Sequence, residues 1–393
     1  MSRIPGRRFP ALTLVLMTML IPSAFATVRG TEQLTPVLLA VQDGPVPFTG
    51  SDGRTHLVYE LWVTNFSSSD AVIERVQILG GGVVLQDLDS AEIATRLQPA
   101  GTRVSTATLA ESVRALLYLH IVLAPRAKIP RQIIHRVTAH IAAAPPGQQE
   151  ITADGAPTEP DLRGVAHISS PLLGERYLSA DSCCDATRHT RAALPINGRV
   201  WVAQRFAVDW EQLDASGRIY SGPRENPASY TIFGKPALAV ADAIVESVTK
   251  GYHEQIPGEY PVNIPLEEAD GNSVILKLGD HRYALYAHLQ PGSIKVHRGD
   301  RVRTGQVLGL VGNTGNSVAP HLHFHVMDGP SPLSSNGLPY EIDNFQVVAK
   351  SPGTEAFDQA EANGTPLAIT PIIPAHSVHD SLPLDQLVIS FSR

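Results

Sequence analysis

The protein has 393 residues, of which 43% are hydrophobic, 18% are charged and two are cysteines, and its formal net charge is −7. This length suggests two domains, and the apolar fraction is sufficient for packed cores. The acidic balance does not provide the basic surface that nucleic-acid binding requires, so we expect no nucleic-acid partner.

Residues 1–26 have the pattern of a secretion signal peptide. Arginines without acidic neighbours precede an apolar run, and Ala24-x-Ala26 provides a small-residue cleavage site. The run is short for a bilayer-spanning helix, which favours cleavage after Ala26 over a retained membrane anchor. We therefore expect a periplasmic or secreted protein without stable membrane insertion after cleavage.

Residues 27–141 are expected to form an antiparallel, immunoglobulin-like β-sandwich. Apolar and polar side chains alternate over residues 56–67 and again over residues 132–141, and glycine-rich turns separate the expected strands. This part contains no cluster of reactive groups. We interpret it as a packing or docking module that could contact a protein partner.

The rest of the chain divides by composition. Residues 142–180 begin with an Ala-, Pro- and Gly-rich stretch that predicts a linker. Residues 181–350 have short apolar runs between Gly, Asn and Pro turns, which predicts a second all-β domain. Residues 351–393 form a Pro-rich C-terminal extension that ends in an expected edge strand, "DQLVISF". The predicted fold class is therefore all-β.

The segment "PHLHFHV" places three histidines at alternating positions, His321, His323 and His325. Side chains two residues apart in a strand point to the same face, so the three imidazoles would line one surface. Neutral imidazole is a zinc ligand and a general base near neutral pH. The alternative is a row of strand histidines with no chemical role.

Ordered motifs upstream favour a chemical role. They are Gly271-Asn272, "YAHL" ending at Leu289, "VRTGQVLG" from Val302, and "GNTGNS" before the histidine row. The glycine-rich "GNTGNS" lacks the Lys-Ser/Thr ending of a phosphate-binding loop, so we interpret it as a tight turn that presents His321. In this order the motifs resemble the core of the LytM/lysostaphin-type zinc endopeptidases, which cut peptidoglycan peptides, over about 150 residues.

This resemblance implies a LytM-type antiparallel β-sheet domain over residues 181–350 and a single Zn²⁺ cofactor. It implies that His323 is a zinc ligand and that His288 and His321 are catalytic. The remaining family ligands come from an H-x-x-x-D motif, which corresponds here to "RFAVD". Asp209 is present, but Arg205 replaces the histidine, and a guanidinium is not a zinc ligand at ordinary pH.

Another residue would then have to supply the third ligand. Asn197-Gly198 is a hairpin turn signal, and strands folded about it would place His189 opposite the neighbourhood of Arg205. A register slip of one residue would turn His189 to the other face. His325 and the cysteine pair are alternative substitutes.

Arg205 itself has two interpretations. It could be a strand-face cation paired with a carboxylate, or it could contact a substrate carboxylate. The adjacent Cys183 and Cys184 could form a vicinal disulfide, pair with another chain, stay as buried thiols or bind a metal.

Three functions compete. The first is a secreted zinc endopeptidase acting on peptidoglycan peptides. The second is a degenerate LytM-like protein that binds cell wall or regulates a hydrolase, an alternative that Arg205 favours. The third is a carrier module, because "VRTGQVLGLVG" also resembles biotinyl and lipoyl hairpins, but no lysine lies between Arg298 and His325.

Overall fold

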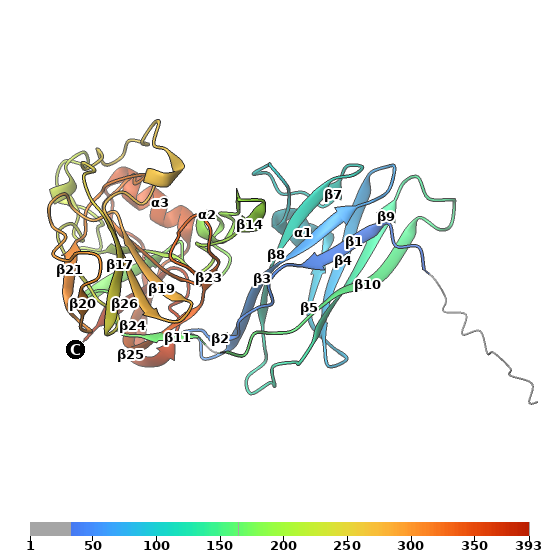
Figure 1. The fold of residues 1–393 in the computed structure, drawn as a ribbon, viewed down its shortest axis with the longest axis horizontal. Coiled ribbons are helices and arrows are strands. Elements are labelled where there is room, and N and C mark those ends of the chain that lie inside the picture. Colours follow the sequence, from blue (N-terminus) through green and yellow to red (C-terminus); the bar gives the residue numbers. More distant parts are fainter. Residues whose placement is uncertain (1–32, 164, 393) are drawn as a thin grey trace, which may run out of the picture. The chain divides into compact units, whose positions relative to one another are not determined.

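The computed structural model describes residues 33–163 and 165–392. The expected signal peptide, residues 1–26, lies outside the described residues, so cleavage after Ala26 stays a prediction. Within the described residues no helix is long and apolar enough to cross a membrane. The chain divides into Met1–Thr35 and Pro36–Arg393. The described helices and strands all belong to the second unit (Figure 1).

Two five-stranded sheets form the N-terminal part of this unit. The first contains β1 (Val37–Val41), β2 (Phe48–Thr49), β3 (Thr55–Asn65), β6 (Leu97–Pro99) and β8 (Arg114–Val122). The second contains β4 (Ala71–Gly80), β5 (Val83–Asp89), β7 (Thr108–Leu109), β9 (Ile133–Ile141) and β10 (Glu150–Thr158). A short helix, α1 (Ser90–Arg96), connects β5 to β6.

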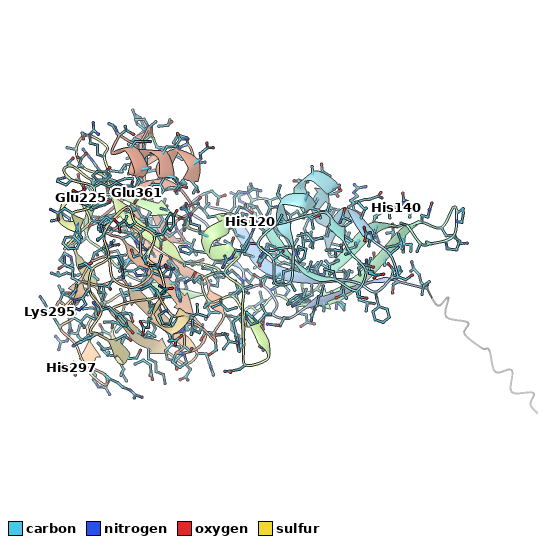
Figure 2. All side chains as sticks on the ribbon, turned by 90° about the horizontal axis from the view of Figure 1, so that it is seen from above. His120, His140, Glu225, Lys295, His297 and Glu361 are labelled. Atoms are coloured by element: carbon cyan, nitrogen blue, oxygen red, sulfur yellow. A yellow bond between two sulfur atoms is a disulfide. The ribbon has the colours of Figure 1, made fainter. Side chains whose placement is uncertain are left out.

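The expected alternation explains how these sheets pack. Leu57, Leu61 and Val63 of β3 are fully buried, and so are Ile73 and Val76 of β4; all five belong to one apolar cluster. Burial alternates along the whole of β9 as the sequence predicts. Figure 2 labels one residue of each sheet, His120 and His140. The antiparallel sandwich is confirmed, whereas its immunoglobulin-like arrangement stays a prediction.

A twelve-stranded, mostly antiparallel sheet forms the second part. Its main path runs β11 (Ala166–Ile168), β24 (Tyr340–Lys350), β26 (Leu387–Phe391), β12 (Gly174–Ala180), β15 (Val208–Gln212), β22 (Leu322–Met327), β19 (Arg282–Ala287), β18 (Ser273–Gly279), β17 (Ala243–Thr249) and β20 (Arg301–Val302). β23 (Gly337–Leu338) pairs with β22, and β25 (Thr370–Ser381) pairs with β24. The all-β class is confirmed.

Smaller elements surround this sheet. Two separate two-stranded antiparallel sheets are the hairpin of β13 (Leu194–Ile196) with β14 (Arg199–Trp201), and the long-range pair of β16 (Pro236–Leu238) with β21 (Val307–Leu310). The helices are α2 (Thr187–Thr190), α3 (Thr354–Asn363) and the 3₁₀ turns η1 (Pro227–Ser229) and η2 (Leu266–Glu268). Figure 1 shows α2 and α3 near one another, on one side of the strands.

Two expectations about the chain's connections were wrong. Residues 142–180 were expected to be a linker, but they contain β10, β11 and β12, because their backbone groups pair with neighbouring strands. The final strand β26 was expected at a sheet edge, yet it pairs with both β12 and β24. Apolar side chains such as Ile389, which is fully buried, suit that central position.

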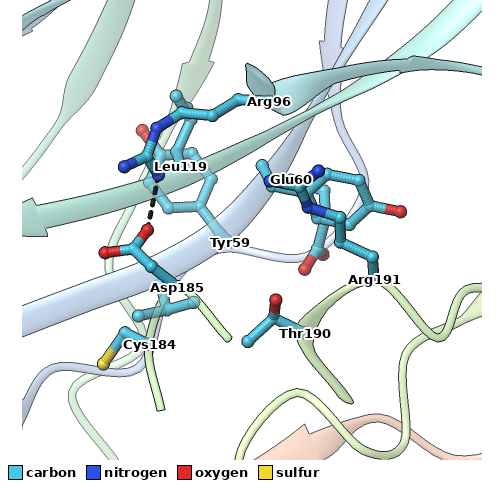
Figure 3. Close-up of a pocket in the computed structure, with 10 residues that line it drawn as sticks. Tyr59, Glu60, Arg96, Leu119, Cys184, Asp185, Thr190 and Arg191 are labelled. Atoms are coloured by element: carbon cyan, nitrogen blue, oxygen red, sulfur yellow. Dashed lines mark hydrogen bonds and ion pairs between the residues drawn. The ribbon is translucent and has the colours of Figure 1, made fainter. Parts of the chain in front are cut away.

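Ion pairs connect the sandwich to the second part within Pro36–Arg393. Arg205 donates from Nε and NH2 to the two carboxylate oxygens of Glu60, at 2.7 and 2.6 Å. Arg96 donates to Asp185 at 2.6 Å, and Figure 3 shows this pair in a small pocket that Glu60 also lines. These contacts hold residues far apart in the sequence in one unit.

Candidate metal centre and its cleft

The candidate site begins with three adjacent strands of the large sheet. β22 lies between β15 and β19, and its His323 is the register partner of both Asp209 and Ala287. His288 directly follows β19, with a positive φ of 61° that directs the chain away from the ladder. Strand pairing therefore brings an acid and two histidines from three separate sequence regions to one place.

The histidine row lies as its alternation predicts. His321 precedes β22, and His323 and His325 lie within that strand. His323 and His325 are buried, and the ring centroids of His288 and His321 lie 4.7 Å apart. The row is therefore directed into the protein rather than to solvent.

His189 also reaches the site, by a route that the sequence did not predict. The Asn197-Gly198 turn forms as expected, with Ile196 opposite Arg199, but the ladder ends at Leu194. His189 lies instead on α2, after the chain leaves β12 beside Asp209 and turns back. Its Nε2 is 3.4 Å from Asp209 Oδ2. The hairpin argument was wrong, although the expected proximity to Asp209 is present.

These side chains form two overlapping groups of possible metal ligands. Donor atoms of His189, Asp209 and His323 all lie within 4.8 Å of one another, and so do those of His288, His321 and His323. His323 Nδ1 is 2.8 Å from Asp209 Oδ1, and His321 Nε2 is 3.4 Å from the same oxygen. A carboxylate and two imidazoles form a donor set typical of catalytic zinc sites.

Backbone carbonyls determine which ring nitrogens are free. His189 Nδ1 donates to the carbonyl of Asp181 at 2.8 Å, and His288 Nδ1 donates to that of Thr314 at 2.7 Å. His321 Nδ1 donates to the carbonyl of Ala319 at 2.8 Å. A carbonyl oxygen can only accept, so Nδ1 carries a hydrogen in each ring. The Nε2 atoms are then available to the site, which is how second-shell partners usually orient metal-binding histidines.

His325 orients His323 rather than joining the ligand group. Its Nδ1 is 3.0 Å from His323 Nε2, and its own Nε2 is buried without a hydrogen-bond partner among the described residues. Burial lowers the pKa of His325 well below its usual value, so the ring is neutral. The sequence also allows His325 as a substitute ligand, but in the structure it is not among the described donor groups around Asp209 and contacts His323 instead.

The charges in the site depend on one another. Burial opposes ionisation of Asp209, but His189 and His321 outweigh burial and hold the pKa of Asp209 well below its usual value. Burial lowers the pKa of His189 while Asp209 raises it, with a net increase to about 9. The partly buried carboxylate is thus stabilised by a counter-charge, which an imidazolium or a metal cation can supply.

Arg205 does not contact this site. Its guanidinium is buried, binds Glu60 through two nitrogens and donates from NH1 to Gly337 O at 3.1 Å. Among the described residues that line the cleft around Asp209, Arg205 is absent. The interpretation as a carboxylate-paired cation agrees with these contacts, and the substrate-contact alternative does not.

The cysteines form a vicinal disulfide, Cys183–Cys184, in the loop before α2. Cys184 also lies near His56 and His120, but a disulfide sulfur is not a thiolate ligand. His56 and His120 bond to each other at 2.8 Å, and His120 bonds to Asp185 at 2.8 Å. We therefore assign no metal to this second histidine cluster.

A cleft of about 560 Å³ opens over the candidate metal centre. Its lining includes Asp209, His189, His288, His321 and His323. It also includes five acidic residues that sequence reasoning missed, Asp181, Glu211, Asp270, Asp358 and Glu361. For Glu211 a signal existed, because it lies two residues after Asp209 in a strand and therefore shares its face.

The family model of "Peptidase family M23" matches residues 230–335. Residues 230–335 are therefore similar to peptidase family M23. The matched region contains His288, His321 and His323, whereas His189 and Asp209 precede it. The recognition of a LytM/lysostaphin-type domain is thereby confirmed.

Curated relatives match over short stretches. The glycyl-glycine endopeptidase ALE-1 of Staphylococcus capitis is 49% identical over 59 residues, which cover 14% of this chain and 16% of the relative. The DD-carboxypeptidase/endopeptidase Mpg of Neisseria meningitidis is 38% identical over 106 residues, covering 25% and 24%. The chain therefore spans a quarter or less of the length of these relatives.

Solved structures give weaker similarity. The catalytic domain of lysostaphin from Staphylococcus simulans aligns with 21% identity and a TM-score of 0.23, covering 42% of this chain and 88% of that chain. The M23 metalloprotease pseudoalterin aligns with 13% identity and a TM-score of 0.26, covering 53% and 97%.

Proposed function

We propose that this protein is a secreted, zinc-dependent endopeptidase that hydrolyses peptide bonds in peptidoglycan. The observation that carries the proposal is the convergence of donor atoms from His189, Asp209 and His323 within 4.8 Å, inside a cleft that His288 and His321 also line. The relatives support the substrate class, since one of them is named peptidoglycan DD-endopeptidase ShyA, from Vibrio cholerae, with 37% identity over 65 residues covering 16% of this chain and 15% of the relative.

The residues present suit one zinc ion. His189 offers Nε2 because its Nδ1 hydrogen is donated to Asp181 O, and Asp209 offers a carboxylate oxygen. His323 offers Nδ1 if its Nε2 hydrogen is donated to His325 Nδ1, 3.0 Å away. Three protein ligands leave a fourth position open, which distinguishes catalytic from structural zinc sites. Zinc in such a site supplies a Lewis acid that polarises a carbonyl and acidifies water.

The two other histidines, His288 and His321, act as proton acceptor and hydrogen-bond donor in the proposed reaction. The backbone carbonyls of Thr314 and Ala319 hold the Nδ1 hydrogens of His288 and His321, so both Nε2 atoms are directed toward the reaction site. Burial and neighbouring imidazoles lower the pKa of His288 well below its usual value, which keeps its Nε2 able to accept the proton of an attacking water. Asp209 raises the pKa of His321 despite burial, so its protonated Nε2 can donate to the oxygen on which negative charge develops.

Zinc content provides the first test. We expect about one zinc per mature chain, and His323→Ala should remove it because no other group replaces the lost ligand. His297→Ala is the matched control, because the His297 side chain is 80% exposed, does not line the cleft and is labelled at the edge of the molecule in Figure 2. Zinc below about a tenth of an equivalent in the loaded wild type would refute the catalytic proposal.

Hydrolysis provides the second test. Wild-type protein and the His297→Ala variant should release soluble peptides from purified peptidoglycan, and His323→Ala should not. A protein that binds zinc and peptidoglycan but releases nothing would instead be the cell-wall-binding or hydrolase-regulating protein that we considered as the alternative. The sandwich would then be the natural place to search for its protein partner.

A further inference from the structure

Glu211 is a buried acid that the proposed mechanism does not use. It lies two residues after Asp209 in β15, on the same face of the strand. Only 3% of Glu211 is exposed, and its Oε2 is buried with no hydrogen-bond partner among the described residues. An unpartnered buried acceptor is costly, so this oxygen indicates a donor that the chain itself does not supply.

A second orphaned oxygen lines the same cleft. Asp181 is also 3% exposed, and its Oδ1 is buried without a partner, while its Oδ2 accepts from Arg188 at 2.7 Å. The other terminal nitrogen of Arg188 donates to Asp358 at 2.7 Å. Among the hydrogen bonds of the described residues, none joins Arg188 to Glu211.

The helix α3 also contributes residues to this cleft. Glu361 of this helix lines the cleft with Glu211 and is labelled in Figure 2. Among the ion pairs of the described residues, none involves either carboxyl group. The charge of Glu361 acts on Glu211, so the two carboxyl groups lie near each other. Arg224 lines the cleft as well, and its charge acts on Glu361.

We propose that Glu211 and Glu361 form a subsite for an ammonium group of the substrate peptide, beside the metal centre. An ammonium carries three hydrogens and a positive charge, so it can donate to Glu211 Oε2 and offset both carboxylates. This inference rests on the proposed function, because the metal centre defines where the scissile amide lies.

The position of Glu211 in β15 determines how far the ammonium subsite lies from the metal ligand Asp209. Two strand residues span about 7 Å, which is also the length of about two residues of an extended peptide. The subsite therefore selects peptides with a free amino group within about two residues of the scissile amide. Both carboxyls lie outside residues 230–335, so the subsite comes from parts of the chain beyond the family match.

Binding provides a test that does not depend on turnover. The probes are soluble cross-linked peptide dimers purified from peptidoglycan, and the same dimers after N-acetylation, which removes the charge of their amino groups. We expect zinc-loaded wild-type protein to bind the free-amine dimer at least tenfold more tightly than the acetylated one. Glu211→Gln and Glu361→Gln should each reduce this ratio to less than threefold.

Glu355→Gln is the matched control, since Glu355 is exposed on the same helix and does not line the cleft. It should retain the wild-type ratio, and zinc content and melting temperature should be the same in all variants. Equal affinity of the wild type for both dimers, or an unchanged ratio in Glu211→Gln, would overturn the subsite. So would a second equivalent of zinc or calcium that competes with the dimer.

Cleavage separates this inference from the proposed function. If the wild type binds the free-amine dimer selectively but cleaves neither dimer, the endopeptidase proposal fails and the subsite stands. If it cleaves both dimers with equal affinity and rate, the endopeptidase proposal stands and the subsite fails.

Discussion

Arg205 occupies the position where the LytM/lysostaphin-type peptidases have a histidine metal ligand. Its contacts therefore explain what this substitution does in the present protein. The structure pairs it with Glu60, which is 12% exposed, and Arg205 itself is 7% exposed at its side chain. We predict that Glu60→Leu destabilises the protein by about 4 kcal/mol, because a buried guanidinium then loses its counter-charge.

The magnitude follows from the contacts. Arg205 makes three hydrogen bonds, two to Glu60 at 2.7 and 2.6 Å and one to Gly337 O at 3.1 Å. Glu60→Leu removes the two charge-assisted bonds, each worth about 1.5–3 kcal/mol. Replacing both partners, as Glu60→Leu with Arg205→Met, removes the orphaned charge and should recover stability to within about 1.5 kcal/mol of wild type.

Urea unfolding of the single and double variants measures both values. Asp87→Ala is the control, because Asp87 accepts two hydrogen bonds from Arg75 in an exposed ion pair. The Arg75 side chain is 54% exposed and that of Asp87 is 37% exposed. Its loss should change stability by at most about 1 kcal/mol. The reasoning is refuted if Glu60→Leu costs less than Asp87→Ala, or if the double variant folds but no longer binds zinc.

Two further predictions concern His325 and Asp385. His325→Leu should weaken zinc binding about 10- to 100-fold in equilibrium dialysis, because His323 loses its orienting partner. His325→Asn keeps an acceptor in place of Nδ1 and should bind zinc normally. Equal zinc affinities of the two variants would contradict this role. Burial raises the pKa of Asp385 to about 7 from a usual value near 4. The native state therefore keeps a proton that the unfolded chain releases, and this acid costs stability as pH rises from about 4 to 7. Asp385→Asn keeps the acceptor for Ser182 N–H, so its stability advantage over wild type should increase by about 2 kcal/mol between pH 5 and pH 8 in urea unfolding, and an advantage independent of pH would count against this assignment.

The sequence by itself determined the local patterns. The period-two alternation that predicted β3 and β9 is a property of the extended backbone, since successive side chains point to opposite faces. The same rule placed His321, His323 and His325 on one face without any knowledge of the fold. The ordered motifs from Gly271 to Phe324 were likewise sufficient to identify the peptidase domain.

Only the tertiary structure decided which distant groups meet. His189 reaches Asp209 by a chain reversal into α2, Arg205 finds Glu60 145 residues away, and α3 brings Glu361 to the cleft wall. These long-range contacts depend on the order of the strands in the sheet and on the direction of turns, which the local alternation of side chains does not determine. Backbone geometry therefore made each face of the site predictable, while the residues that complete it depended on how the whole chain packs.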